Sequence, residues 1–115
     1  MDGAVARRVL RLAGLGVRSR GAVVGVEGVR EAARRGKIVL ALVATDASKH
    51  SLSKVVPLLT ARHVRVVSIG ASKELGHAVG RENTTVVGII DQQLAQGIRE
   101  LTDSVPDRSQ GEGSD

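Results

Sequence analysis

The chain has 115 residues, of which 42% are hydrophobic, so it can form one domain with a modest core. It contains no Phe, Trp, Tyr or Cys, which excludes base stacking on aromatic rings, disulfides and thiolate metal sites. No apolar run approaches the roughly 18 residues of a membrane span, and the N-terminal residues lack the pattern of a secretory signal. We therefore expect a cytoplasmic protein that does not bind membranes.

Positive charge is concentrated in the first third of the chain. The formal net charge is +5 overall, but residues 7–37 alone contain nine basic and two acidic residues, a net charge of +7. A field of this kind attracts polyanions, and nucleic acids are the commonest polyanions inside cells. The charge by itself gives no sequence specificity, and a solvated basic face without a partner remains the alternative.

Apolar residues recur with helical and strand periods in alternation along the chain. Helical spacing predicts helices at residues 4–15, 27–35, 49–62, 72–79 and 92–101. We expect the first of these to end at Gly14 and Gly16, and the second to end at Gly36. Short apolar runs predict strands at residues 21–25, 38–44, 64–69 and 86–90. The run at 38–44 is apolar throughout, which is typical of a central strand covered on both faces.

Three local features complete the expected fold. Pro57 lies inside the third predicted helix, and it either kinks that helix or begins its second half. Ser72 is the expected N-cap of the fourth helix, with Glu74 in its first turn. Residues 103–115 are rich in Asp, Ser, Gly and Pro, so we expect a disordered acidic tail after a single domain at residues 1–102. The alternation of elements predicts an α/β fold, a three-layer α/β/α sandwich around a four-stranded mixed sheet.

No catalytic constellation stands out. There is no glycine loop ending in Lys-Ser or Lys-Thr, and the glycines at residues 21–28 lack the spacing of a dinucleotide fingerprint. His50, His63 and His77 are far apart in the sequence, and we interpret them as surface residues rather than as metal ligands. Asp46 and Ser48 near His50 are interpreted as helix caps. We therefore expect no enzymatic activity, no cofactor and no metal.

Several short motifs, taken in order, resemble the kink-turn-binding ribosomal-protein superfamily. They are VGVEGVREA at 24–32, RG at 35–36, the apolar strand ending at 44, DAS at 46–48, KELG at 73–76, AVG at 78–80 and VVGIID at 86–91. The resemblance covers about residues 9–101 and is greatest to the small bacterial YlxQ-like branch, which shares a Leu-rich first helix leading into a glycine. It implies an α/β/α sandwich that binds structured RNA without catalysis, with members in ribosomes and other RNA–protein particles.

The resemblance also implies two RNA-contacting segments. The first corresponds to residues 25–31, where backbone amides at a helix N-terminus would meet a phosphate. The second corresponds to the loop before residue 87, where short side chains would pack on a base turned out of its stack. The candidate RNA-binding residues are Gly25, Val26, Glu27, Gly28, Arg30, Glu31, Arg34, Arg81, Asn83, Thr84, Thr85 and Val86.

The first segment departs from the family pattern. Where strong RNA binders of the family carry Asn, Glu and Lys, this chain has Glu27, Gly28 and Glu31. Glu27 is expected to accept a hydrogen bond from a guanine amino group, and Arg30, Arg34 and Arg35 are expected to contact phosphates. This interface requires Arg30, Arg34 and the Arg81 loop to converge on one surface. The alternative is a protein-interaction module on the same fold, which predicts an exposed apolar patch near Val26 or Val86. In either case we expect a monomer.

Overall fold

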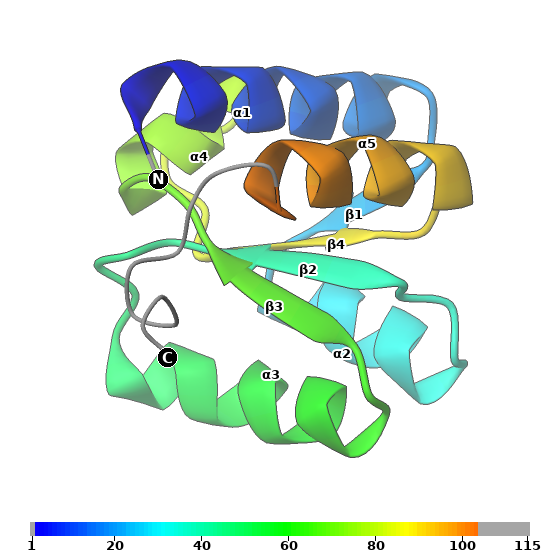
Figure 1. Ribbon diagram of the computed structural model, residues 1–115. Coiled ribbons are helices and arrows are strands. Elements are labelled where there is room, and N and C mark those ends of the chain that lie inside the picture. Colours follow the sequence, from blue (N-terminus) through cyan, green and yellow to red (C-terminus); the bar gives the residue numbers. More distant parts are fainter. Residues whose placement is uncertain (1, 104–115) are drawn as a thin grey trace, which may run out of the picture.

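The computed structural model describes residues 2–103, and the expected tail beyond residue 103 lies outside the described residues. Helices and strands alternate in the expected order (Figure 1). The helices are α1 (Gly3–Arg18), α2 (Val26–Arg34), α3 (Lys49–Ala61), α4 (Ser72–Ala78) and α5 (Gln92–Asp103). The strands are β1 (Ala22–Val24), β2 (Leu40–Val43), β3 (Arg65–Ser68) and β4 (Val86–Ile89).

The four strands form one mixed sheet in the order β1-β4-β2-β3. Strands β2 and β3 are parallel, with Leu40 opposite Arg65, whereas β4 runs antiparallel to both of its neighbours. Strands β1, β2 and β3 therefore end at the same edge of the sheet at which β4 begins. The segments that follow β1, β2 and β3 and precede β4 meet at this edge.

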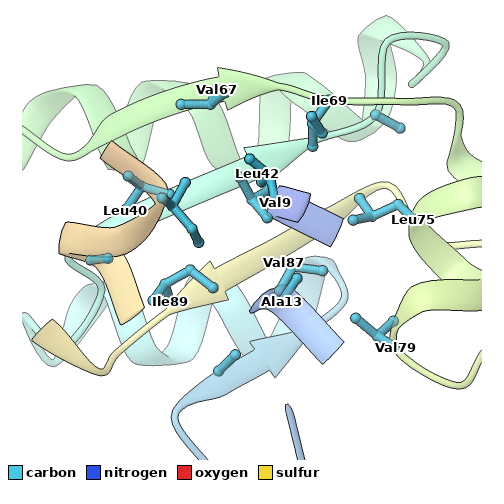
Figure 2. Packing of buried hydrophobic residues seen from close by; sticks show 14 residues of the cluster. Val9, Ala13, Leu40, Leu42, Val67, Ile69, Leu75, Val79, Val87 and Ile89 are labelled. Carbon is cyan, nitrogen blue, oxygen red and sulfur yellow. The ribbon is translucent and has the colours of Figure 1, made fainter. Parts of the chain in front are cut away.

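Helices cover both faces of the sheet, which confirms the three-layer sandwich. Helices α1, α4 and α5 lie on one face, and α2 and α3 lie on the other (Figure 1). Strand β2 shows why its sequence is apolar throughout. Leu40 and Leu42 pack with α1 and α5 residues on the first face, as Figure 2 shows, while Ala41 and Val43 pack against α2 and α3. Many small branched side chains fill both cores in the absence of aromatic residues.

The first helix is longer than expected, because its glycines do not end it. Helix α1 continues to Arg18 through Gly14 and Gly16, both of which are buried. A Cβ atom at Gly14 would lie 2.4 Å from the carbonyl oxygen of Ala78 in α4, and one at Gly16 would lie 3.1 Å from the Cβ of Ala22. These glycines permit close packing of α1 against its neighbours, so the prediction of a C-terminal signal at this point was wrong.

Local hydrogen bonds explain the remaining helix boundaries. Pro57 is accommodated within a single helix, α3, and the hydroxyl of Ser48 caps that helix by accepting from the amide of Ser51. Helix α4 is capped differently from the prediction: Ser72 is its first residue rather than its N-cap, and the Ser72 amide donates to the carboxylate of Asp46 at 2.8 Å. Asp46 thus caps a helix that begins 26 residues later in the chain.

The last helix ends one residue beyond the expected domain boundary. Asp103 belongs to α5, and its carboxylate accepts from the guanidinium of Arg65 in β3 at 2.6 Å. This hydrogen bond lowers the pKa of the Asp103 carboxyl below its ordinary value. Within residues 2–103, no helix has the length and apolar character needed to cross a membrane.

Candidate nucleic-acid interface

Three loops and the start of a helix lie together at the edge of the sheet where β4 begins. We call this cluster the loop end; it comprises the N-terminus of α2 and residues 44–48, 69–72 and 80–85. The amide of Ala44 donates to the carbonyl of Thr85, and the amide of Thr45 donates to the carbonyl of Gly70. The amide of Thr84 donates to the carbonyl of Ser72. These bonds are 2.8–2.9 Å long and link the three loops into one surface.

The N-terminus of α2 presents backbone amides at this surface. Gly25 has φ +95°, a conformation that side-chain-bearing residues rarely adopt, and it provides no side chain to cap the helix. The amides of Val26, Glu27 and Gly28 begin the helix and so have no acceptor within it. Together with the helix dipole, they form a region suited to an anion such as a phosphate.

Gly76 of α4 determines the path of the loop before β4. The amide of Arg81 donates to the carbonyl of Gly76 at 2.7 Å, and the loop then passes directly over this glycine. A Cβ atom at Gly76 would lie 2.8 Å from the backbone of Glu82 and Asn83. The exposed side chains of Arg81, Glu82 and Asn83 are therefore held at the loop end by backbone contacts.

A single hydrogen bond joins the two expected RNA-contacting segments. The amide of Gly25 donates to the carbonyl of Val86 at 2.9 Å, which continues the β1–β4 ladder by one residue beyond Val24 and Val87. Segments that are about 60 residues apart in the sequence thus lie side by side.

The candidate residues differ in their accessibility at this surface. Glu27, Glu31, Arg34, Arg81 and Asn83 are exposed, whereas Gly25, Val26, Gly28, Arg30 and Thr85 are half-buried. Val86 is 1% exposed and packs in the core beneath α2 and α3, and Thr84 is 5% exposed. Their side chains do not reach the surface, so the expectation that Val86 packs on a base does not fit this structure.

The arginines of α2 do not converge as expected. Arg30 is half-buried and its guanidinium donates to the carbonyl of Lys54 in α3. Arg34 lies in the last turn of α2, about 12 Å along the helix axis from the loop end. Glu31 is not an isolated carboxylate, because it pairs with Arg35 at 2.9 Å one turn further along the helix. The prediction that Arg34 converges with the Arg81 loop on one surface was therefore wrong.

The strongly basic stretch at residues 7–37 is divided between two layers. Its first arginines lie on α1, which covers one face of the sheet, and its last basic residues lie on and after α2, which covers the other face (Figure 1). The net charge of +7 is therefore not the charge of one surface.

Sequence reasoning missed a groove beside the loop end. Lys73 and His77 of α4 face Glu82 and Asn83 of the loop across a groove of about 360 Å³. The signal was present in the KELGHA sequence of α4, where Lys73 and His77 are one turn apart, but only the loop identifies their neighbours. Within residues 2–103, no three His, Asp or Glu side chains are placed to hold a metal ion.

Fold and loop end together define a small α/β/α protein in which a helix N-terminus without a side-chain cap lies at the same edge of the sheet as a polar loop. The model of the ribosomal protein L7Ae/L30e/S12e/Gadd45 family matches residues 7–99, and the chain belongs to this family. A comparison with curated proteins gives no significant match.

Two solved structures resemble the whole fold. A protein with unknown function from Bacillus halodurans has a TM-score of 0.76 and 28% identity, covering 83% of this chain and 96% of its own. The 15.5kD RNA binding protein of Giardia lamblia has a TM-score of 0.77 and 22% identity, covering 91% of this chain and 90% of its own. The second similarity establishes the shared fold.

Proposed function

We propose that this protein binds structured RNA, without catalysis, through the loop end. The observation that carries this proposal is the hydrogen bond between Gly25 and Val86, which holds a helix N-terminus without a side-chain cap beside the start of β4, directly after the polar loop that contains Arg81 and Asn83. Phosphates favour such a helix N-terminus, and exposed Arg and Asn side chains bind phosphates and base edges. Family membership and the RNA-binding protein of the same fold from Giardia lamblia support RNA as the ligand.

We further propose a kink-turn-like RNA as the target. Glu31 is the residue least suited to this role, because an exposed carboxylate beside a phosphate costs about 1 kcal/mol. Its ion pair with Arg35 supplies a compensating charge within the same turn. The glycine-containing end of α1 supports a place in the YlxQ-like branch, and a cytoplasmic monomer that joins ribosomal or other RNA–protein particles fits this function.

A protein-interaction module is less well supported. That function predicts an exposed apolar patch near Val26 or Val86, but Val86 is buried and Val26 is half-buried. Within the described residues the exposed large hydrophobic side chain is Leu15, which lies on α1 across the sheet from α2. RNA binding is therefore the function that the loop end favours.

The test is the double variant Gly28→Glu and Glu31→Lys, which restores the family's residue types in the first segment. A side chain fits at Gly28, since a Cβ there would lie no closer than 3.8 Å to Val23. The two changes raise the net charge by one unit. In gel-shift titrations we expect the variant to gain more affinity for a kink-turn RNA than for a plain duplex. Restored site geometry favours the kink-turn, whereas added positive charge favours both RNAs.

Thr60→Lys is the matched control, because it raises the charge by the same unit at an exposed position in the last turn of α3, about 16 Å along the helix axis from the loop end. Equal gains on both RNAs in the double variant, or no gain, would show that residues 25–31 do not read a kink-turn. A gain of the control on the kink-turn alone would refute the assignment to the loop end.

A further inference from the structure

A second basic surface lies on α1, on the opposite face of the sheet from α2. Helix α1 contains four arginines and no acidic residue among its 16 residues. Arg7, Arg11 and Arg18 are four and seven residues apart, so they lie within about 40° of one another around the helix axis. They form a row about 16 Å long on the exposed side of the helix.

The row lines a groove between α1 and α4. The groove has a volume of about 360 Å³, and its lining consists of the three arginines together with Leu10, Gly14 and Ala78. Gly14 forms the groove floor, and the guanidinium of Arg18 turns back over it, since a Cβ atom there would lie 3.4 Å from Arg18 Nη1. No carboxylate lines this groove.

These arginines have no partner among the described residues. In that part of the chain, ion pairs join Arg35 to Glu31 and Arg65 to Asp103, and no hydrogen bond from Arg7, Arg11 or Arg18 is present. The groove on the other side of α1 differs, because Glu100 of α5 lines it together with Arg8 and Arg11. Three unneutralised guanidinium groups in one row are unfavourable for the isolated protein, and a row of negative charges would relieve their repulsion.

We propose that the Arg7–Arg11–Arg18 row is a second nucleic-acid surface that binds the backbone phosphates of double-stranded RNA. Guanidinium groups match phosphate geometry in a bidentate manner, and a rigid helix presents them at fixed spacing. The major groove of duplex RNA is too narrow for a helix, so α1 lies across the backbone and reads no sequence. The surface faces away from α2, so the protein can hold two RNA segments at once, one at the loop end and one along α1.

The test compares two triple variants with the full-length protein. Arg7, Arg11 and Arg18 are replaced by Ala, which favours the helix at exposed positions. The matched control replaces Lys37, Lys54 and Arg62 by Ala, which removes the same charge at exposed positions on α3 and after α2 and α3, on the opposite face of the sheet from α1. Circular dichroism melts verify that both variants fold.

The measurement is the affinity for a plain RNA duplex as a function of salt concentration. Three lost phosphate contacts should reduce the slope of log K against log salt by about 2 to 3, and the control should reduce it by less than about 1. Replacing the three arginines by Lys, which retains the charge, should preserve most of the slope. The ratio of kink-turn affinity to duplex affinity, which reports on the loop end, should not fall in the Arg7, Arg11 and Arg18 variant, and this separates a failure of the second surface from a failure of the first.

Three results would overturn the proposal. The first is an unchanged slope in the Arg7, Arg11 and Arg18 variant, and the second is an equal loss in the control. The third is normal duplex binding by that variant together with lost binding to polyglutamate, which would identify an acidic protein as the partner of α1.

Discussion

Gly28→Ala should stabilise the fold and leave RNA binding nearly unchanged. Gly28 is the third residue of α2, and neither its backbone conformation nor its surroundings require glycine. The added Cβ would lie 3.8 Å from the Cβ of Val23, an ordinary contact. Glycine in a helix costs up to about 1 kcal/mol relative to alanine, so we expect a gain of about 0.5–1 kcal/mol, which corresponds to about 2–8 °C in Tm for a domain of this size.

The proposed RNA interface accommodates a side chain at Gly28, since the test variant described above places Glu there. A methyl group adds neither charge nor a hydrogen-bonding group, so we expect the affinity for a kink-turn RNA to stay within about twofold of the wild type. Gly97→Ala is the control: it adds a methyl group inside α5, 3.5 Å from Leu12, and should stabilise the fold without changing the affinity. Thermal melts and gel shifts on both variants decide the point. A several-fold loss of affinity in Gly28→Ala would show that RNA approaches the backbone at this point and would refute the placement of Glu there, and a destabilised protein would refute the packing argument.

Three further results are expected from the same structure. Gly76→Ala should lower stability by about 1–3 kcal/mol in chemical denaturation, because its Cβ would collide with the backbone of Glu82, and it should weaken RNA binding by displacing the loop. Deleting residues 104–115 should leave the melting temperature unchanged, because the segment lacks periodic apolar residues and α5 is complete without it. Arg65→Ala should return the lowered pKa of the Asp103 carboxyl to its ordinary value in an NMR titration; the stabilisation by this pair is present above the unfolded pKa and is lost as the pH falls through the folded value.

The order and type of the elements could be predicted because the spacing of apolar residues along the sequence reflects which side of each helix or strand is buried. Strand β2 is buried on both faces and is apolar throughout, and α5 buries Ala95 and Ile98 on one side. Glycine was harder to interpret. Gly36 follows the end of α2 with φ +70°, as expected, but Gly14 and Gly16 have the same local sequence signal and serve close helix packing instead. Only the neighbouring elements distinguish these two uses of glycine.

The location of the candidate site could be predicted from the order of elements, because ligands commonly bind at strand ends in α/β proteins. The positions of its side chains depend on contacts between segments that are far apart in the sequence. Asp46 was interpreted as a cap of the helix that directly follows it, but Ser48 caps that helix and Asp46 caps α4, a contact that only the fold reveals. Val86 looked like a loop residue available to a base, but the antiparallel pairing of β4 with β2 turns its side chain into the core. Arg34 belongs to the same helix as Gly25, but the direction of the helix carries it away from the loop end.

The distribution of charge indicates different roles for the loop end and for the arginine row of α1. Along α2, Glu31 and Arg35 neutralise each other, and their side chains remain 61% and 63% exposed, so the pair contributes about 0–1 kcal/mol to stability and adds little net attraction for RNA at the nearby loop end. Recognition there depends on backbone amides and on a few side chains, which act at short range. Long-range attraction comes from arginines that form no ion pair, and α1 supplies four of these among the described residues, on the opposite layer. A protein organised in this way would capture RNA through α1 and discriminate among RNAs at the loop end, so the two functions should be separable by mutation.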